Sequence, residues 1–273
     1  GGSFRDKVAT VDQSGKRIWI FPQKPKGKYY NARTALSVLY LVVFFVLPFI
    51  KVKGHPLFLI NILERKFILF GQIFWPQDFF IFRLGMVLFI VFIALFTVGC
   101  GRVFCGWRCP QTIFMVMVFR KVEYCIEGDA AQQRMLKNKR WDADKIFKKG
   151  IKSLVFWVIS FLIANTFLSY IIGVDQLEKI VTEPISKHIG GFTSIFIFTS
   201  VFFLVYAWFR EQVCTVVCPY GRLQSVLLDS NSIIVAYDYV RGEPRGKFKK
   251  NQEREIGDCI DCEQCVKVCP TGI

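Results

Sequence analysis

Nine of the ten cysteines lie in three motifs that each end in Cys-Pro, and their spacing is typical of metal or redox sites. Four of them form one run, Cys259-x-x-Cys262-x-x-Cys265-x-x-x-Cys269-Pro270. Bacterial ferredoxins have this spacing: three close thiolates bind one iron–sulfur cluster, and the fourth cysteine binds a second cluster. A zinc knuckle is disfavoured, because the run contains no histidine and zinc sites do not favour this spacing. We therefore expect all four thiolates to bind iron–sulfur clusters.

This run is half of a two-cluster ferredoxin. A second run of the same kind is needed, and none follows before Ile273. The first three thiolates therefore lack their usual fourth partner, and Cys269 lacks its other three. We expect the natural protein to continue past this point and to hold two 4Fe–4S clusters. Otherwise the fourth ligand must come from elsewhere; Cys125 is the nearest spare thiol, although we interpret it as structural by default.

Outside that run a shorter motif, Cys-x-x-x-Cys-Pro, occurs twice, with Cys105 and Cys109 in the first copy and Cys214 and Cys218 in the second. On a helix, positions i and i+4 share a face, so each pair can chelate one ion or contribute to one site. Soft thiolates favour Cu(I) or iron–sulfur clusters. Copper and a single Cys₄ cluster therefore remain alternatives. Structural cysteines at a helix end are a third alternative, which the repetition of the whole motif disfavours.

The first copy has neighbours that the second lacks. Cys100 is a candidate third metal ligand, and Phe209 occupies the corresponding place in the second copy. Arg102 and Arg108 flank the first pair. Their charge either lowers the pKa of the thiols or anchors the segment to lipid phosphates, and the sequence leaves both roles open.

Apolar segments separated by blocks of charge must position these motifs. Four of them are about long enough to cross a membrane, namely residues 35–50, 80–98, 154–172 and 192–209. Lysine and arginine are abundant in the N-terminal segment, the 120–152 loop and the C-terminal segment, and scarce in 51–79 and 173–192. The positive-inside rule then predicts cytoplasmic termini. All three cysteine motifs fall on the cytoplasmic side of this topology.

The sequence thus predicts a mainly α, polytopic membrane helical bundle. We expect a cytoplasmic segment over 1–34, a four-span domain over 35–228 and the start of a ferredoxin-like iron–sulfur domain over 229–273. The order span, loop, span, Cys-x-x-x-Cys-Pro occurs twice in the same orientation. A pseudo-two-fold axis along the membrane normal is therefore expected, with the two motifs face to face.

The segments between the spans also carry expectations. Residues 51–79 contain charges among apolar residues and predict an interfacial hairpin or short helix. Residues 112–119 are apolar but too short to span, so we expect them along the cytoplasmic surface. The basic 120–152 loop is expected to be solvated and close to anionic lipids.

Composition excludes several functions. The formal net charge is +15, with 36 basic and 21 acidic residues. Loop lysines and arginines of a membrane protein explain this charge better than nucleic-acid binding does. His55 and His188 are the only histidines and lie in predicted outer loops, so a bis-histidine haem within the membrane is excluded. Walker, dinucleotide and Ser-His-Asp patterns are absent from the sequence.

Several longer segments resemble the FixG/RdxA/CcoG family of accessory proteins for cbb-type cytochrome oxidase assembly. The resemblance covers nearly the whole chain. It rests on Trp19-Ile20-Phe21-Pro22, Phe74-Trp75-Pro76-Gln77-Asp78, Gly99-Cys100-Gly101-Arg102-Val103, Cys109-Pro110-Gln111, Arg210-Glu211-Gln212-Val213-Cys214, Cys218-Pro219-Tyr220 and Arg241-Gly242-Glu243-Pro244-Arg245-Gly246, followed by Gly257-Asp258-Cys259.

The resemblance implies a Cu(II) reductase with a polyferredoxin domain in the bacterial inner membrane. Cys105, Cys109, Cys214 and Cys218 would hold copper during its reduction to Cu(I). A copper transporter or chaperone of oxidase assembly would receive Cu(I), while the electron donor stays unknown and a homodimer stays open. Two alternatives remain: a quinol-linked electron-transfer subunit, and a non-enzymatic copper chaperone or assembly scaffold.

Overall fold

The computed structural model describes residues 17, 19, 21–52, 55–61, 66–69, 71–74, 79–100, 103–183, 189–228, 232–233, 237–246, 257–260, 262 and 264–268. Four of its helices are long and apolar enough to cross a membrane. They are α1 (Lys28–Val46), which runs on through η2 (Leu47–Phe49), α2 (Phe79–Cys100), α7 (Ala143–Ile172), and α9 (Ile189–Leu204), which runs on through η5 (Val205–Phe209). The four predicted spans are therefore confirmed by length and composition.

Helix α2 presents its apolar side chains outward. Leu88 and Leu95 are 71% and 69% exposed. A helix that exposes apolar groups on this scale needs a non-aqueous surrounding, because water would penalise so large an apolar surface. The lipid chains of a membrane supply that surrounding, in keeping with its length.

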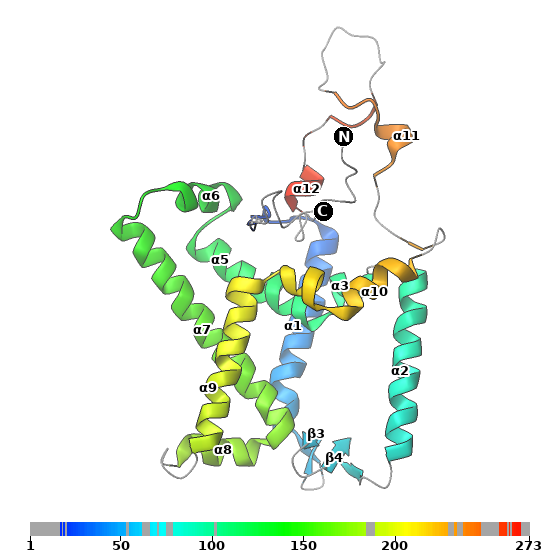
Figure 1. Cartoon of the computed structure of the whole chain (residues 1–273), viewed down its shortest axis with the longest axis vertical. Coiled ribbons are helices and arrows are strands. Elements are labelled where there is room, and N and C mark those ends of the chain that lie inside the picture. The colour runs from blue at the N-terminus through cyan, green and yellow to red at the C-terminus, as the bar shows by residue number, and fades with distance from the viewer. Residues whose placement is uncertain are drawn as a thin grey trace.

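The segment between α1 and α2 folds as short antiparallel strands. β1 (Lys51–Val52) pairs with β2 (His55–Pro56). β3 (Phe58–Asn61), β4 (Lys66–Leu69) and β5 (Gln72–Phe74) form a meander in that order. The expected hairpin is confirmed. Together with α8 (Val174–Thr182), the strands lie at one end of the bundle, opposite α3 and α10 (Figure 1).

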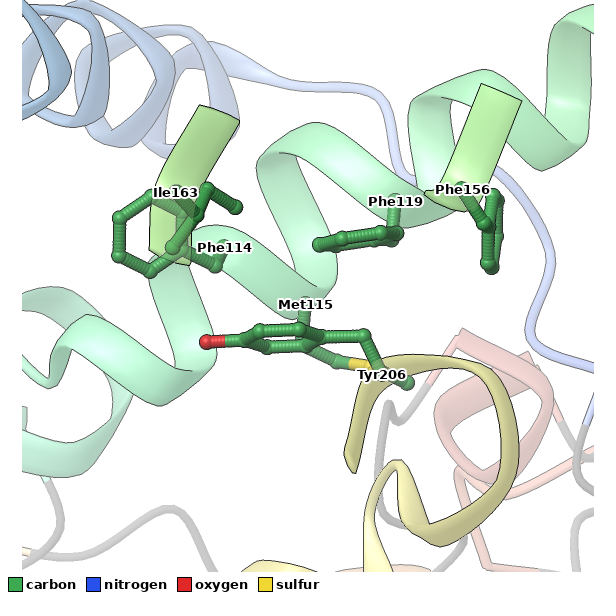
Figure 2. Close-up of a cluster of buried hydrophobic side chains, with 6 residues drawn as sticks. All are labelled: Phe114, Met115, Phe119, Phe156, Ile163 and Tyr206. Atoms are coloured by element: carbon green, nitrogen blue, oxygen red, sulfur yellow. The ribbon is translucent and has the colours of Figure 1, made fainter. Parts of the chain in front are cut away.

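Residues 113–119 lie largely in the interior, with five of the seven buried, so the predicted place of residues 112–119 along the surface was wrong. They follow α3 (Val103–Trp107) and α4 (Pro110–Thr112) and form the π-helix η4 (Ile113–Phe119). Phe119 stacks on Tyr206 with ring centroids 4.5 Å apart and meets Phe156 edge-on at 4.8 Å. Figure 2 shows these rings with Phe114, Met115 and Ile163. A segment that is apolar all round gains more from burial between helices than from an interface.

The basic 120–152 segment is largely helical, which corrects the expected loop, although most of residues 131–152 are exposed as expected. It contains α5 (Arg120–Ile126) and α6 (Ala130–Asn138), the latter started by an Asp129–Gln132 capping box. Lys145 at the start of α7 is 4% exposed. Its ammonium group donates to the carbonyls of Lys137, at 3.0 Å, and Lys139. These bonds hold the end of α6 against α7.

Four short helices complete the described chain. They are the π-helix η6 (Val213–Val217), α10 (Pro219–Leu227), α11 (Tyr239–Gly242) and α12 (Gln264–Val268). Helix α10 lies beside the end of α2, on the same side of the bundle as α3 (Figure 1). The elements that carry the cysteine motifs are thus collected at one end of the spans.

Candidate metal centre

The two Cys-x-x-x-Cys-Pro motifs share one backbone conformation. Cys109 and Cys218 are both extended, at φ −63°, ψ 123° and φ −72°, ψ 115°. Each precedes a proline that starts the next helix, and proline disfavours helical geometry in the residue before it. The Cys109 N–H donates to the Phe104 carbonyl at 3.1 Å, and the Cys218 N–H donates to the Val213 carbonyl at 2.8 Å. Each motif therefore ends in a wide turn. The two cysteines of a motif do not lie on one face of a continuous helix, as the i, i+4 spacing had led us to expect.

The structure packs the first motif against the helix that follows the second. The Cys105 thiol donates to the Gln224 side-chain oxygen on α10 at 3.2 Å, and Gln224 is 4% exposed. Phe104 meets Tyr220 edge-on, with ring centroids 5.7 Å apart. Tyr220 also hydrogen-bonds the Thr97 hydroxyl of α2. Motifs that are far apart in sequence are thereby neighbours in space.

Cys214 and Cys218 of the second motif are both partly buried. Burial raises the pKa of the Cys214 thiol to about 11, and the Cys109 and Cys218 thiolates and Glu211 act in the same direction. Cys109 belongs to the first motif, so the two copies are close enough to interact electrostatically. The raised pKa keeps Cys214 protonated at neutral pH, and a metal ion would bind there by displacing that proton.

The described thiols do not form a closed ligand shell. Within the described ranges, no group of three or more His, Cys, Asp or Glu side chains is placed to hold a metal ion. The nine described cysteines form no disulfide bonds with one another. Cys100 ends α2 and is partly buried, whereas Cys125 is exposed on α5. A copper or Cys₄ site at the two motifs therefore stays a prediction.

A buried network of ion pairs, which the sequence reasoning missed, supports the second motif. Arg120 of α5 lies 3.3 Å from Glu211, and both side chains are less than 5% exposed. Arg210 pairs with Glu123, another α5 residue. The Cys214 N–H donates to the Glu211 carbonyl at 3.1 Å, so the network reaches the motif directly. The sequence signal for this network was the position of its charged residues directly beside apolar segments.

In the ferredoxin-like segment, residues 241–246 contact the first cysteine of the run, Cys259. The Gly246 N–H donates to the Cys259 carbonyl at 3.2 Å, and the Gly257 N–H donates to the Pro244 carbonyl at 2.9 Å. Arg241 and Asp258 form an ion pair at 2.7 Å. Two chain segments that are separated in sequence thus hold Cys259 between them.

The donor set of this segment fits an iron–sulfur cluster. Cys259 is partly buried, and Cys262 and Cys265 are exposed, so none is locked in an apolar core. Three soft thiolates at two-residue spacing match the chemistry of a cluster site. Cys259, Cys262 and Cys265 would hold one cluster; Cys269, predicted as the ligand of a second, lies outside the described residues.

Comparison with known proteins assigns the family. A family described as "4Fe-4S binding domain" matches residues 82–124, and one described as "4Fe-4S dicluster domain" matches residues 209–273. Protein RdxA of Cereibacter sphaeroides is 36% identical over 94% of this chain and 55% of its own length. Nitrogen fixation protein FixG of Rhizobium meliloti is 33% identical over 94% of this chain and 50% of its own length. The chain belongs to the FixG/RdxA family.

The FixG/RdxA assignment confirms the resemblance and the iron–sulfur chemistry. The chain spans about half the length of these two curated relatives. The putative electron transport protein YccM of Escherichia coli is also similar, at 24% identity over 69% of this chain and 46% of its own length. No solved structure matches. This member of the family carries 4Fe–4S binding domains and four apolar helices of spanning length.

Both shorter motifs lie inside the 4Fe–4S matches. Cys100, Cys105 and Cys109 fall within residues 82–124, and Cys214 and Cys218 fall within residues 209–273. The family match therefore includes the membrane-edge thiols as well as the ferredoxin-like run. Among the alternatives, it favours electron transfer over purely structural cysteines.

Proposed function

We propose that this protein reduces Cu(II) to Cu(I) at the membrane edge, for assembly of a cbb-type cytochrome oxidase. The observation that carries the proposal is the packing of the first Cys-x-x-x-Cys-Pro motif, through Cys105, against Gln224 of α10, the helix that directly follows the second motif. Two converging pairs of thiols would suit a soft monovalent ion, because thiolates stabilise Cu(I) over Cu(II).

The residues have distinct roles in this reaction. Cys105, Cys109, Cys214 and Cys218 bind the copper substrate, with Cys100 as a candidate additional ligand, and each thiol that coordinates it releases its proton. Cu(II) gains one electron and becomes Cu(I). Iron–sulfur clusters supply one-electron transfer when bound, through Cys259, Cys262, Cys265 and Cys269. A copper transporter or chaperone then accepts Cu(I).

The proposed topology follows from charge. Lysine and arginine concentrate beside the end of the bundle that carries α3, α10 and the ferredoxin-like segment, so we place this end in the cytoplasm and the spans in a bacterial inner membrane. A cytoplasmic thiol site would meet reduced electron donors directly. Labelling of Cys125, an exposed thiol on α5, by a membrane-impermeant reagent tests this: intact cells should leave it unlabelled.

The deciding experiment measures Cu(II) reduction by the purified full-length protein with a chemical electron donor. Cys105→Ala and Cys214→Ala should abolish turnover while the iron content stays intact, and Cys125→Ala is the matched control. Unchanged turnover of Cu(II) in both motif variants would contradict the proposal. Loss of iron in those variants would instead favour a Cys₄ cluster at the membrane edge. Binding of Cu(I) without turnover of Cu(II) would favour a chaperone.

A second candidate function, quinol-linked electron transfer, is favoured by one pocket of about 260 Å³. It is lined by aromatic side chains and one arginine, including Tyr30, Trp107, Tyr124 and Arg33. The Arg33 Nε and Nη2 atoms are buried and have no hydrogen-bond partner in the described structure. Such a pocket suits a conjugated ring whose carbonyl oxygens accept hydrogen bonds. Trp107 lies between Cys105 and Cys109, so a ring there would adjoin the first motif.

Oxidation of menadiol by the purified protein tests this second function. Arg33→Gln should lower the rate, because the ring oxygens lose their donor, while Arg134→Gln on exposed α6 should not. Equal rates in both variants would remove quinol as the electron donor.

A further inference from the structure

A second pocket, of about 250 Å³, lies where the N-terminal segment, α6 and α7 meet. Four basic side chains line it, Lys137, Lys149, Lys152 and Arg210, against one carboxylate, Glu127. The formal charge of the lining is therefore strongly positive. This pocket is separate from the cysteine motifs. It is also separate from the aromatic pocket beside Arg33, because the two pockets share no lining residue.

Much of this charge is not neutralised within the protein. Lys152 lies 2.7 Å from Glu123 and 2.9 Å from Glu127. Lys137 and Lys149, by contrast, form no ion pair with other described residues; each places its ammonium group near an aromatic ring, at 5.8 and 5.1 Å. These two lysines are available to an anion from outside the chain.

A buried donor points to the same conclusion. Arg210 is 3% exposed, and its Nε atom has no hydrogen-bond partner among the described residues. Leaving a buried charged donor unsatisfied is unfavourable, and native proteins rarely do so. A bound oxyanion in the pocket would accept this hydrogen bond. The Arg210 Nη2 atom is already paired with Glu123, so among the described residues the unpartnered Nε and the free charge of Lys137 and Lys149 together favour an oxyanion.

The depth of the pocket indicates the source of that anion. The apolar part of α7, residues 154–172, has about the length needed to cross the ~30 Å hydrocarbon core. Lys149 and Lys152 precede it by less than two turns, which places them at the level of the lipid headgroups. Figure 1 shows α6 and the start of α7 at the same end of the bundle as α3 and α10.

We propose that this pocket binds the phosphate group of an anionic phospholipid headgroup. Basic pockets between membrane helices at headgroup depth are suited to such lipids. A free nucleotide would offer the same phosphate chemistry, but the two rings that line the pocket, Trp19 and Phe21, already lie against cationic side chains and leave little room to stack a base. Arg17 and Arg210 lie 4.2 and 5.5 Å from the ring of Trp19, and Lys137 lies near that of Phe21.

The lipid would also stabilise the second cysteine motif. Arg210 is adjacent to Glu211, whose carbonyl accepts the Cys214 N–H at 3.1 Å. A phosphate that satisfies Arg210 therefore reinforces the ion-pair network at the start of this motif. The lipid would therefore stabilise the protein close to the thiols, but it would take no part in their chemistry.

Native mass spectrometry of the full-length protein tests the proposal, with phosphatidylglycerol and phosphatidylcholine as the probes. Wild-type protein should retain one phosphatidylglycerol molecule and no phosphatidylcholine under matched activation. Lys137→Gln and Lys149→Gln should each weaken phosphatidylglycerol binding about fivefold, the expected weight of one lysine near an anionic lipid. Lys148→Gln is the matched control, because Lys148 pairs with Asp144 and does not line this pocket.

Competition by inorganic phosphate and adenosine monophosphate distinguishes the sources. Millimolar phosphate should not displace the lipid, and adenosine monophosphate should not bind. Equal lipid retention in wild type, Lys137→Gln and Lys149→Gln would overturn the site, as would equal retention of phosphatidylcholine. Binding of adenosine monophosphate that the two lysine variants weaken would overturn the lipid as the ligand. Iron content and melting temperature check that each variant is folded.

Discussion

The Cys105 thiol lies 3.2 Å from the Gln224 side-chain oxygen, and this hydrogen bond joins the first cysteine motif to the helix that follows the second. Gln224 is 4% exposed, so the bond is shielded from water. Cys105 and Gln224 are far apart in the sequence, and the pairing arises because α10 packs beside the end of α2. The position of the first motif therefore depends on the position of α10, the helix that follows the second motif.

Gln224→Leu should therefore impair the thiol site without removing the ferredoxin-like cluster. Loss of this bond should reduce the unfolding free energy by about 1 kcal/mol and lower the rate of Cu(II) reduction. Thermal unfolding and the reductase assay measure the two effects. Leu223→Ala, at an exposed neighbour on α10, should change neither. A full rate in Gln224→Leu would show that the motifs act independently.

The raised pKa of Cys214 predicts slow alkylation of this thiol. Only the thiolate reacts, and a pKa of about 11 leaves roughly one molecule in a thousand ionised at pH 8. Iodoacetamide should modify metal-free Cys214 far more slowly than exposed Cys262, and the rate should rise tenfold per pH unit toward pH 11. Peptide mass spectrometry follows both sites. Equal rates at pH 8 would contradict the buried, protonated thiol.

The same shift makes stability depend on pH at the alkaline end. Because the folded-state pKa lies above the ordinary thiol value of 9, the folded protein holds this proton more tightly than the unfolded chain does. The contribution is fully present below pH 9 and is lost as the pH rises through about 11. Cys214→Ser should flatten the fall in melting temperature over this window; an unchanged fall would assign it to other groups.

The ion pair between Arg120 and Glu211 should be sensitive to loss of one partner. Both side chains are less than 5% exposed, so Glu211→Gln removes a buried negative charge that lies 3.3 Å from the Arg120 guanidinium. Breaking such a pair typically lowers stability by about 3–5 kcal/mol. Asp144→Asn removes the exposed Lys148–Asp144 pair and should lower stability by less than about 1 kcal/mol. Equal melting temperatures in the two variants would contradict the buried network.

Gly257→Ala should reduce iron binding by the ferredoxin-like segment. A Cβ atom at this position would lie 2.6 Å from the Gly242 carbonyl carbon and 2.7 Å from the Glu243 oxygen. The 241–246 loop would have to move away from Cys259, which it contacts through the Gly246 N–H. Iron per chain should fall, as measured by elemental analysis. Gly150→Ala on α7 meets no atom within 4 Å and should leave iron content unchanged.

Local pattern alone determined much of this protein. The four spans follow from runs of apolar residues, since a bilayer requires about twenty of them in succession. The iron–sulfur run is set by spacing within twelve residues, and the family matches support it without reference to the fold. These features depend on neighbours in sequence, so the sequence is sufficient to predict them.

Only the tertiary structure decided what surrounds the motifs. Residues 113–119 are apolar whether they lie on a membrane surface or in a core, and packing with Phe156 and Tyr206 placed them in the core. The sequence lists Arg120 and Glu211 as charges but not as partners, and it gives no reason to pair Cys105 with Gln224. Such contacts join distant segments, and burial then makes each of them energetically important. The surroundings of the thiols are therefore a property of how the helices pack.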